Sequence, residues 1–174
     1  TVTVLDLGAN TSFLNFYNGK NLIFSREIPI GGEHLTHAMA KPITTAASTI
    51  TITMDDAEKL KRNCGIPLGD EAKVEFLTDY GPLRGEQITA MLRPTLERLV
   101  MEVSRTFNYY SKTFNAPNIE ELYLTGGTSR MRNIDRFLLL NLEGVKKIEP
   151  LNILKAVKGW AEVGVFKQEL MLEQ

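Results

Sequence analysis

The chain has 174 residues, of which 43% are hydrophobic and 24% are charged, and these values are typical of one globular domain rather than of a disordered chain. Its 20 basic and 21 acidic residues leave a net charge of −1, which gives no overall attraction to nucleic acid or to anionic lipid. One cysteine excludes an internal disulfide, and no apolar run reaches the roughly 20 residues of a membrane-spanning helix, so we expect a cytoplasmic protein without nucleic-acid partners or direct membrane insertion.

Three antiparallel strands are predicted at the start of the chain. The opening stretch TVTVLDLGAN alternates in polarity, and we expect Val2, Val4 and Leu7 to lie on the buried side of the first strand. A second strand over 11–17 and a third over 21–30 follow, and the Asn-Gly pair between them is typical of a hairpin.

Two helices are predicted in the next part of the chain. The first covers 33–40, after the Gly31-Gly32 pair, and the second covers 54–64, with Thr53 as its N-cap and Gly65 as its end. The polar, β-branched stretch 42–53 fits a strand, a loop or an extended arm. The stretch 66–85 is rich in Pro and Gly, which predicts a small peripheral unit.

The remainder of the chain reads as helix, strand, helix, strand and helix. A long core helix over 86–114 contains Pro94, which either begins or kinks it. The stretch NIEELYLTGGTSRM predicts a buried strand and a glycine turn, and a helix follows over 132–142. The last elements are a short strand in VKKIEPL and a terminal helix that carries Val157, Trp160, Val163 and Phe166.

Two glycine turns at strand ends and one helix face carry the candidate chemistry. Glycine in the Gly8-Ala9 and Gly126-Gly127 turns lets backbone N–H groups approach an anion closely, although both pairs also fit ordinary turns. Glu58, Lys61 and Arg62 stand at helical spacing, and their ordinary interpretation is a solvated face with one ion pair.

Two other polar groups are interpreted structurally. His34 and His37 stand three residues apart on a helix, but no third metal ligand is evident, so we take them as surface or cap residues. The Tyr109-Tyr110 pair is expected to pack at the edge of the core rather than to stack on bases.

In this order and spacing, the motifs resemble the second half of the actin-like ATPases, the superfamily of the DnaK-type chaperones, MreB, FtsA and PilM. The resemblance implies ATP and Mg²⁺ as cofactors. DLGAN is similar to the second phosphate motif, whose aspartate lies near the nucleotide-bound Mg²⁺, and the helix of Glu58 is similar to the E-x-x-K-R helix that faces adenosine. The residues it assigns to nucleotide binding are Asp6, Gly8, Ala9, Asn10, Gly31, Gly32, Glu58, Lys61, Arg62, Gly126, Gly127, Thr128 and Arg130, with Asp6 also toward the metal.

The implied fold class is α/β, an actin-like ATPase (RNase H-like) domain II. It combines a mixed sheet that has three antiparallel N-terminal strands, flanking helices and a small inserted subdomain. By the same resemblance, 1–43 and 86–174 form the core subdomain (IIA-like), and 44–85 form the inserted one (IIB-like). We expect the chain to be the second half of a longer protein whose first domain carries the first phosphate motif.

Three stretches resemble the PilM family of type IV pilus assembly in particular: FSREIPIGGEHLTHAMA, TMDDAEKLKR and LYLTGGTSRMRNIDRFLLLNLEGVKKIEPLNIL. The resemblance implies a scaffold peripheral to the inner membrane, which binds the N-terminal peptide of a PilN-like protein and other pilus assembly proteins. The peptide groove of the family lies in the first half, so no residue here is assigned to it. The polar stretch 41–53 is longer than the link expected in the family.

Two other functions of the superfamily remain open from the sequence. An FtsA-like cell-division anchor would use a basic amphipathic C-terminal helix, but the end of this chain, WAEVGVFKQELMLEQ, is acidic. A phosphotransferase of the sugar-kinase type would need a catalytic carboxylate in the first half. No catalytic residue is assigned here; because phosphoryl transfer needs positioning from both sides of a cleft, we expect this chain to be inactive alone and the longer protein to be at most a weak ATPase.

Overall fold

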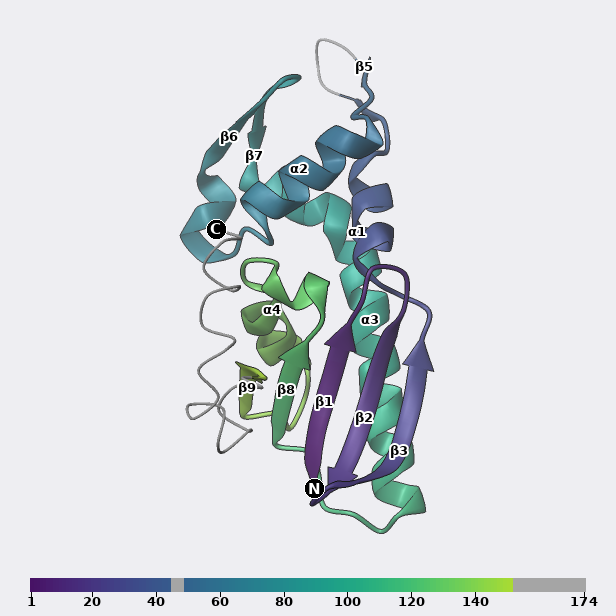
Figure 1. The fold of residues 1–174 in the computed structure, drawn as a ribbon. Coiled ribbons are helices and arrows are strands. Elements are labelled where there is room, and N and C mark those ends of the chain that lie inside the picture. The colour runs from purple at the N-terminus through teal and green to yellow at the C-terminus, as the bar shows by residue number, and fades with distance from the viewer. Residues whose placement is uncertain (45–48, 152–174) are drawn as a thin grey trace, which may run out of the picture.

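The computed structural model describes residues 1–44 and 49–151 (Figure 1). Among them a five-stranded sheet has the order β3-β2-β1-β8-β9. Its strands are β1 (Val2–Leu7), β2 (Ser12–Asn18), β3 (Asn21–Ile28), β8 (Glu121–Thr125) and β9 (Lys147–Pro150).

The sheet is mixed, as the sequence predicts. β1, β2 and β3 are antiparallel neighbours, whereas β8 runs parallel to β1 and β9 runs parallel to β8. The turn between β2 and β3 is made by Gly19 and Lys20, and Gly19 has a φ of +59°, which explains the glycine of the Asn-Gly signal.

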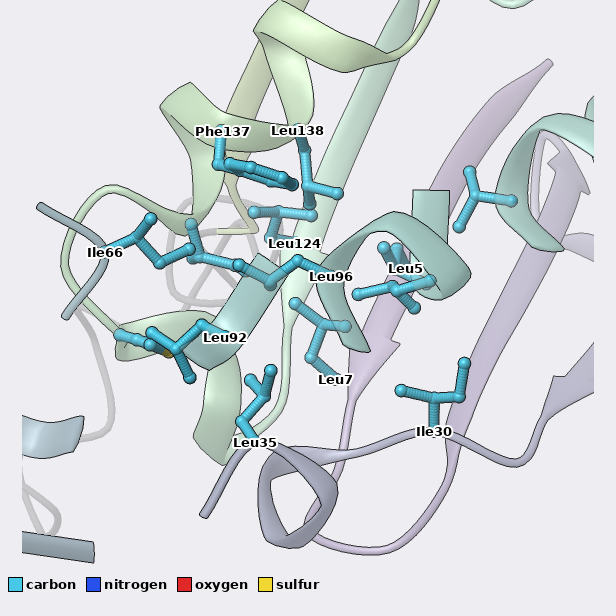
Figure 2. Close-up of a cluster of buried hydrophobic side chains, with 14 of the residues drawn as sticks. Leu5, Leu7, Ile30, Leu35, Ile66, Leu92, Leu96, Leu124, Phe137 and Leu138 are labelled. Carbon is cyan, nitrogen blue, oxygen red and sulfur yellow. The ribbon is translucent and has the colours of Figure 1, made fainter. Parts of the chain in front are cut away.

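Two helices cover one face of this sheet. α3 (Gly85–Thr113) runs behind β1, β2 and β3 in the view of Figure 1, and α4 (Ile134–Asn141) lies behind β8. Figure 2 shows the core between them, where Leu5 and Leu7 meet Leu96 of α3 and the side chains of α4. Pro94 lies in the interior of α3, so the helix does not begin there.

The buried face of β1 differs from the expectation. Leu5 and Leu7 are almost completely buried, whereas Val2 is 43% exposed. Val4 points to the opposite face from Leu5 and is also buried, whereas Asp6, two residues further along that face, is partly exposed. The core side of β1 is therefore that of Leu5 and Leu7, and the prediction combined Leu7 with two residues of the opposite face.

The remaining elements lie beyond the carboxyl ends of β1 and β8 (Figure 1). They are α1 (Gly32–Met39), β4 (Ile43–Thr44), β5 (Thr49–Ile50), α2 (Met54–Cys64), the 3₁₀ turn η1 (Gly69–Lys73), β6 (Glu75–Thr78) and β7 (Gly81–Arg84). Of the alternatives for 42–53, the structure has two short antiparallel strands; residues 45–48 lie outside the described part.

Three side-chain hydrogen bonds join the end of α2 and the segment after it to α3 and to the two residues before α4. Thr89 of α3 donates to the carbonyl of Pro67 (2.7 Å), and Asn133 donates to that of Ile66 (2.9 Å). Arg132 donates to the carbonyl of Cys64 (2.9 Å). The division into subdomains 1–43 with 86–174 and 44–85 stays a prediction.

The expected terminal helix with Val157, Trp160, Val163 and Phe166 lies outside the described residues. None of the helices in the described ranges combines the length and the hydropathy required to cross a membrane.

Candidate functional site

The candidate site lies at the carboxyl ends of two parallel strands. β1 and β8 are paired with Asp6 opposite Thr125, so the turns that follow them meet at the same edge of the sheet. Ligands of open α/β sheets bind outside such strand ends. A cleft of about 770 Å³ lies there between the two turns, α1 and α2, and we call it the strand-end cleft.

The strand-end cleft brings together four segments that are far apart in the sequence. The site residues predicted from the sequence that line it are Ala9, Gly32, Glu58, Lys61, Arg62, Gly127, Thr128 and Arg130. The other predicted residues do not line the cleft but lie close in sequence to residues that do: Asp6 at the end of β1, Gly8 and Asn10 in the turn after it, Gly31 before α1 and Gly126 in the turn after β8.

The turn after β1 packs closely against the start of α1. The carbonyl of Gly8 accepts from the N–H of Gly32 (3.0 Å) and from Thr128 Oγ1 (2.8 Å), and the carbonyl of Ala9 accepts from the N–H of Glu33 (2.8 Å). A Cβ at Gly32 would collide with Thr128 Oγ1. The first N–H groups of α1 are therefore used within the protein, and Gly32 serves close packing in the cleft wall.

The turn after β1 also offers donors to the cleft side. Among the described residues, none accepts a hydrogen bond from the backbone N–H of Ala9 or Asn10. Both residues are exposed. Consecutive free N–H groups in a turn form a concavity that suits an anion.

Gly126 holds the second turn against Asp6. It has a φ of +88°, and a Cβ at this position would collide with Asp6 Oδ1 and with the carbonyl oxygen of Leu7. Only glycine fits this turn, because the carboxylate and the β1 backbone occupy the space of any side chain. Asp6 is thereby held at the end of β1, just before the turn that contributes Ala9 to the cleft lining.

Lys61 joins α2 to α1 across the back of the cleft. Its ammonium donates to the carbonyl of Gly32 (3.0 Å), to Thr36 Oγ1 (2.8 Å) and to Glu58 Oε2 (2.6 Å). The side chain is only 10% exposed. Lys61 is thus a buried, fully hydrogen-bonded cation and not part of a solvated helix face.

Glu58 is the acidic centre of the same wall. Partial burial raises the pKa of this carboxyl, but the hydrogen bonds from Lys61, Thr36 and Arg62 outweigh that effect and lower the pKa to about 2. Glu58 is therefore ionised throughout the physiological range. Arg62 donates its Nε–H to Glu58 Oε1 (2.8 Å), and its side chain is 75% exposed, so the guanidinium keeps donors on the cleft side.

The sequence prediction missed five residues of the cleft. Thr36 and Glu33 follow Gly32 by about one turn or less on α1, and Met54 and Asp55 lie about one turn before Glu58 on α2. Helical spacing from Gly32 and Glu58 would have found most of them, because residues three or four apart share a face. The lining residues in question are Glu33, Thr36, Met54, Asp55 and Met131.

His34 and His37 are exposed, as interpreted from the sequence, and the N–H of Gly31 donates to His34 Nδ1 (3.2 Å). In the described part of the chain, no group of three or more His, Cys, Asp or Glu side chains is arranged to hold a metal ion. Asp6 as a contact of Mg²⁺ stays a prediction.

Comparison with known proteins identifies the family. The family model of the type IV pilus assembly protein PilM matches residues 1–158. A solved PilM-PilN type IV pilus biogenesis complex contains a chain that is 26% identical to this one, with a TM-score of 0.64 over 90% of this chain and 37% of that chain.

Two further solved structures share the fold at lower identity. MreB5 of Spiroplasma citri bound to ADP is 18% identical with a TM-score of 0.66, over 90% of this chain and 50% of that chain. The ethanolamine utilization protein EutJ from Carboxydothermus hydrogenoformans is 19% identical with a TM-score of 0.57, over 86% and 44%.

This chain therefore spans half or less of the length of these structures. The predicted fold class is confirmed, and the family match favours pilus assembly over the cell-division and phosphotransferase alternatives. Since the match extends over residues 1–158, the chain belongs to the PilM family of type IV pilus assembly proteins and has the fold of the actin-like ATPases.

Proposed function

We propose that this chain forms one side of an ATP-binding cleft in a PilM-type scaffold of type IV pilus assembly. The observation that carries the proposal is the convergence of four separate segments on the strand-end cleft, at the carboxyl ends of β1 and β8. A volume of about 770 Å³ suits a nucleotide-sized ligand. The ADP bound to MreB5 supports the same ligand class.

The cleft residues fit the parts of a nucleotide. The free N–H groups of Ala9 and Asn10 suit phosphate oxygens, and the exposed guanidiniums of Arg62 and Arg130 suit phosphate or a flat base. The ionised Glu58 carboxylate accepts hydrogen bonds and suits ribose hydroxyls.

Asp6 would meet Mg²⁺ that arrives with the nucleotide. Mg²⁺ keeps several waters and uses one or two carboxylates together with phosphate oxygens, so a single aspartate at the end of β1 is sufficient. When bound, the ion would neutralise phosphate charge.

We propose no multiple-turnover hydrolysis by this chain alone. Phosphoryl transfer depends on groups placed on both sides of the phosphate, and this chain spans half or less of the structures it matches. The nucleotide would then act on the arrangement of the longer protein, with at most slow hydrolysis there.

The proposed setting is the cytoplasmic side of the inner membrane, reached through partner proteins. The related solved complex pairs a PilM protein with PilN, which supports a PilN-like peptide and other pilus assembly proteins as partners here. We place that peptide in the first half of the longer protein and assign no residue of this chain to it.

A steric variant tests the nucleotide site. A Cβ at Gly127 meets no atom within 4 Å, so Gly127→Leu adds a side chain to the lining of the cleft from an open position. We expect this variant to lose at least about tenfold in affinity for a fluorescent ADP analogue with Mg²⁺, since the ligand loses more than one contact group.

Ala90→Leu adds comparable bulk at an exposed position of α3 outside the cleft and should bind as the wild type does. Equal affinity of all three proteins, with unchanged circular dichroism, would remove the strand-end cleft as the site.

A further inference from the structure

A second surface with the features of a binding site lies at the far edge of the sheet. β3 is the outermost strand of the described sheet and pairs there only with β2. Along such an edge, alternate residues direct their N–H and C=O groups away from the sheet, where they are free to pair with another strand. Leu22 and Ile23 on this strand are 53% and 41% exposed, so the edge is not protected by charge along its first half.

A groove of about 360 Å³ runs between this edge and α3. β3 contributes Phe24, Ser25 and Arg26, and α3 contributes Glu102, Arg105, Thr106 and Tyr109. We call it the edge groove. A free strand edge beside a helix is the arrangement in which peptides bind by adding a strand to a sheet.

One end of the edge groove is aromatic. The Phe24 ring lies 5.5 Å from that of Tyr109 and 5.9 Å from that of Phe114. Tyr109 is 54% exposed and Phe114 is 42% exposed, so these rings present apolar area to solvent. An aromatic or aliphatic side chain placed there would bury that area.

The other end of the edge groove is basic. It contains two arginines and one carboxylate, which leaves a charge of +1. Glu102 accepts from Arg105 (2.9 Å), whereas Arg26 forms no ion pair with any described residue. This end therefore suits a carboxylate, and Arg26 has its guanidinium available to bind it.

The spacing of the two ends matches an extended chain. Phe24 and Arg26 are two apart on β3 and share a face of the sheet. Arg105 and Tyr109 are four apart on α3 and share a face of the helix. A strand added beside β3 would present every second side chain to this face, and thus one to each end.

We propose that the edge groove binds an extended peptide of a partner protein as an additional strand next to β3. The peptide carries an aromatic or aliphatic side chain for the Phe24 and Tyr109 end and, two residues away, a carboxylate for Arg26 and Arg105. This site is separate from the strand-end cleft, and the inference does not depend on nucleotide binding.

The charge of the edge groove favours such a peptide over a second copy of this chain. A second β3 would bring its own Arg26 on the face shared with Phe24, and therefore a cation where the groove is already positive. Like charges at that position oppose the pairing.

The test uses the whole chain and short fluorescent peptides with a threonine background. One peptide has Phe and Asp two residues apart; the others replace Phe by Ala or Asp by Lys. We expect the Phe and Asp peptide to bind and each replacement to weaken binding by about tenfold, which is the effect of losing one charged or aromatic contact.

A charge exchange separates recognition from a structural effect. Arg26→Glu should weaken binding of the Asp peptide by about tenfold and should restore binding of the Lys peptide. Arg93→Glu reverses an exposed charge on α3 outside the edge groove and should change neither.

Backbone methylation tests strand addition. N-methylation of the peptide amides that face β3 should abolish binding, whereas N-methylation of the alternate amides should leave it intact. The proposal is overturned if none of the peptides binds at about millimolar concentration, if Arg26→Glu has no effect, or if sedimentation shows a wild-type dimer that Arg26→Glu dissociates.

Discussion

Lys61 and Arg62 are neighbours in the sequence and bind the same carboxylate, but the structure gives them different roles. Lys61 is 10% exposed and uses its ammonium on Gly32, Thr36 and Glu58, whereas Arg62 is 75% exposed. One residue along a helix turns the side chain by about 100°. Lys61 therefore holds the wall of the strand-end cleft together, whereas Arg62 lies exposed in the lining of the cleft.

This difference predicts unequal effects of two substitutions. Lys61→Met keeps the buried stem but removes the ammonium that donates to the Gly32 carbonyl and to Glu58 Oε2, so we expect a loss of about 2 kcal/mol in the free energy of unfolding. Arg62→Ala removes an exposed ion pair and should cost less than about 1 kcal/mol. Urea unfolding checks both, and equal losses would contradict the assignment.

The exposure of Arg62 also predicts an effect of its substitution on ligand binding. Arg62→Ala should weaken binding of the ADP analogue, because the exposed guanidinium lines the strand-end cleft. Lys59→Ala is the matched control: it removes one exposed cation with one carboxylate partner from the same helix, outside the cleft.

Sequence alone predicted the residue types of this wall but not their partners. Glu58, Lys61 and Arg62 stand at helical spacing, so their ion pairs were predictable from α2 itself. Thr36 and the Gly32 carbonyl come from α1, and their contacts with Lys61 depend on how the two helices pack. Nothing local to either helix encodes that contact.

At the scale of elements, the junction of α1 and α2 responds to pH through Glu58. The pKa of this carboxyl is lowered from its ordinary value of 4.5 to about 2 in the folded protein, so the folded state favours its ionised form. The stabilisation is complete above about pH 4.5 and is lost as the pH falls toward about 2.

Glu58→Gln should therefore reduce the loss of stability between about pH 4.5 and 2, relative to the wild type. Thermal unfolding across this range measures the effect. Glu97→Gln, on exposed α3 surface, removes one carboxylate away from the junction and serves as the control. A slope that is the same for Glu58→Gln and for the wild type would show that the junction does not titrate as described.

Elements with strong local signals were predicted well. Thr53 caps α2 by accepting from the N–H of Asp56 (3.2 Å), and Gly65 has the positive φ expected after a helix, at +61°. β4 and β5 have two residues each, which is too short to produce a recognisable alternating pattern in the sequence. The stretch 42–53 therefore left a strand, a loop and an extended arm open. β1 was predicted as a strand, but its core side was not, because the predicted set combined Leu7 with Val2 and Val4, which point to the opposite face.

At the scale of the whole molecule, the strand-end cleft exists only because distant parts of the chain meet. The two glycine turns are joined by a hydrogen bond from Thr128 to Gly8, across 120 positions of the sequence. From the sequence, the contact between the two glycine turns could be predicted only through the resemblance of the ordered motifs to a known family.

The most direct test of the account is an amide NMR titration of the whole chain with MgADP. We predict that the signals of Ala9, Asn10, Gly127 and Thr128 shift together with those of α2 near Arg62, while the signals of β3 stay unchanged. Shifts of the strand-end cleft that saturate with MgADP would establish it as a nucleotide site. A spectrum that MgADP leaves unchanged, or that changes only away from these residues, would contradict the proposed function.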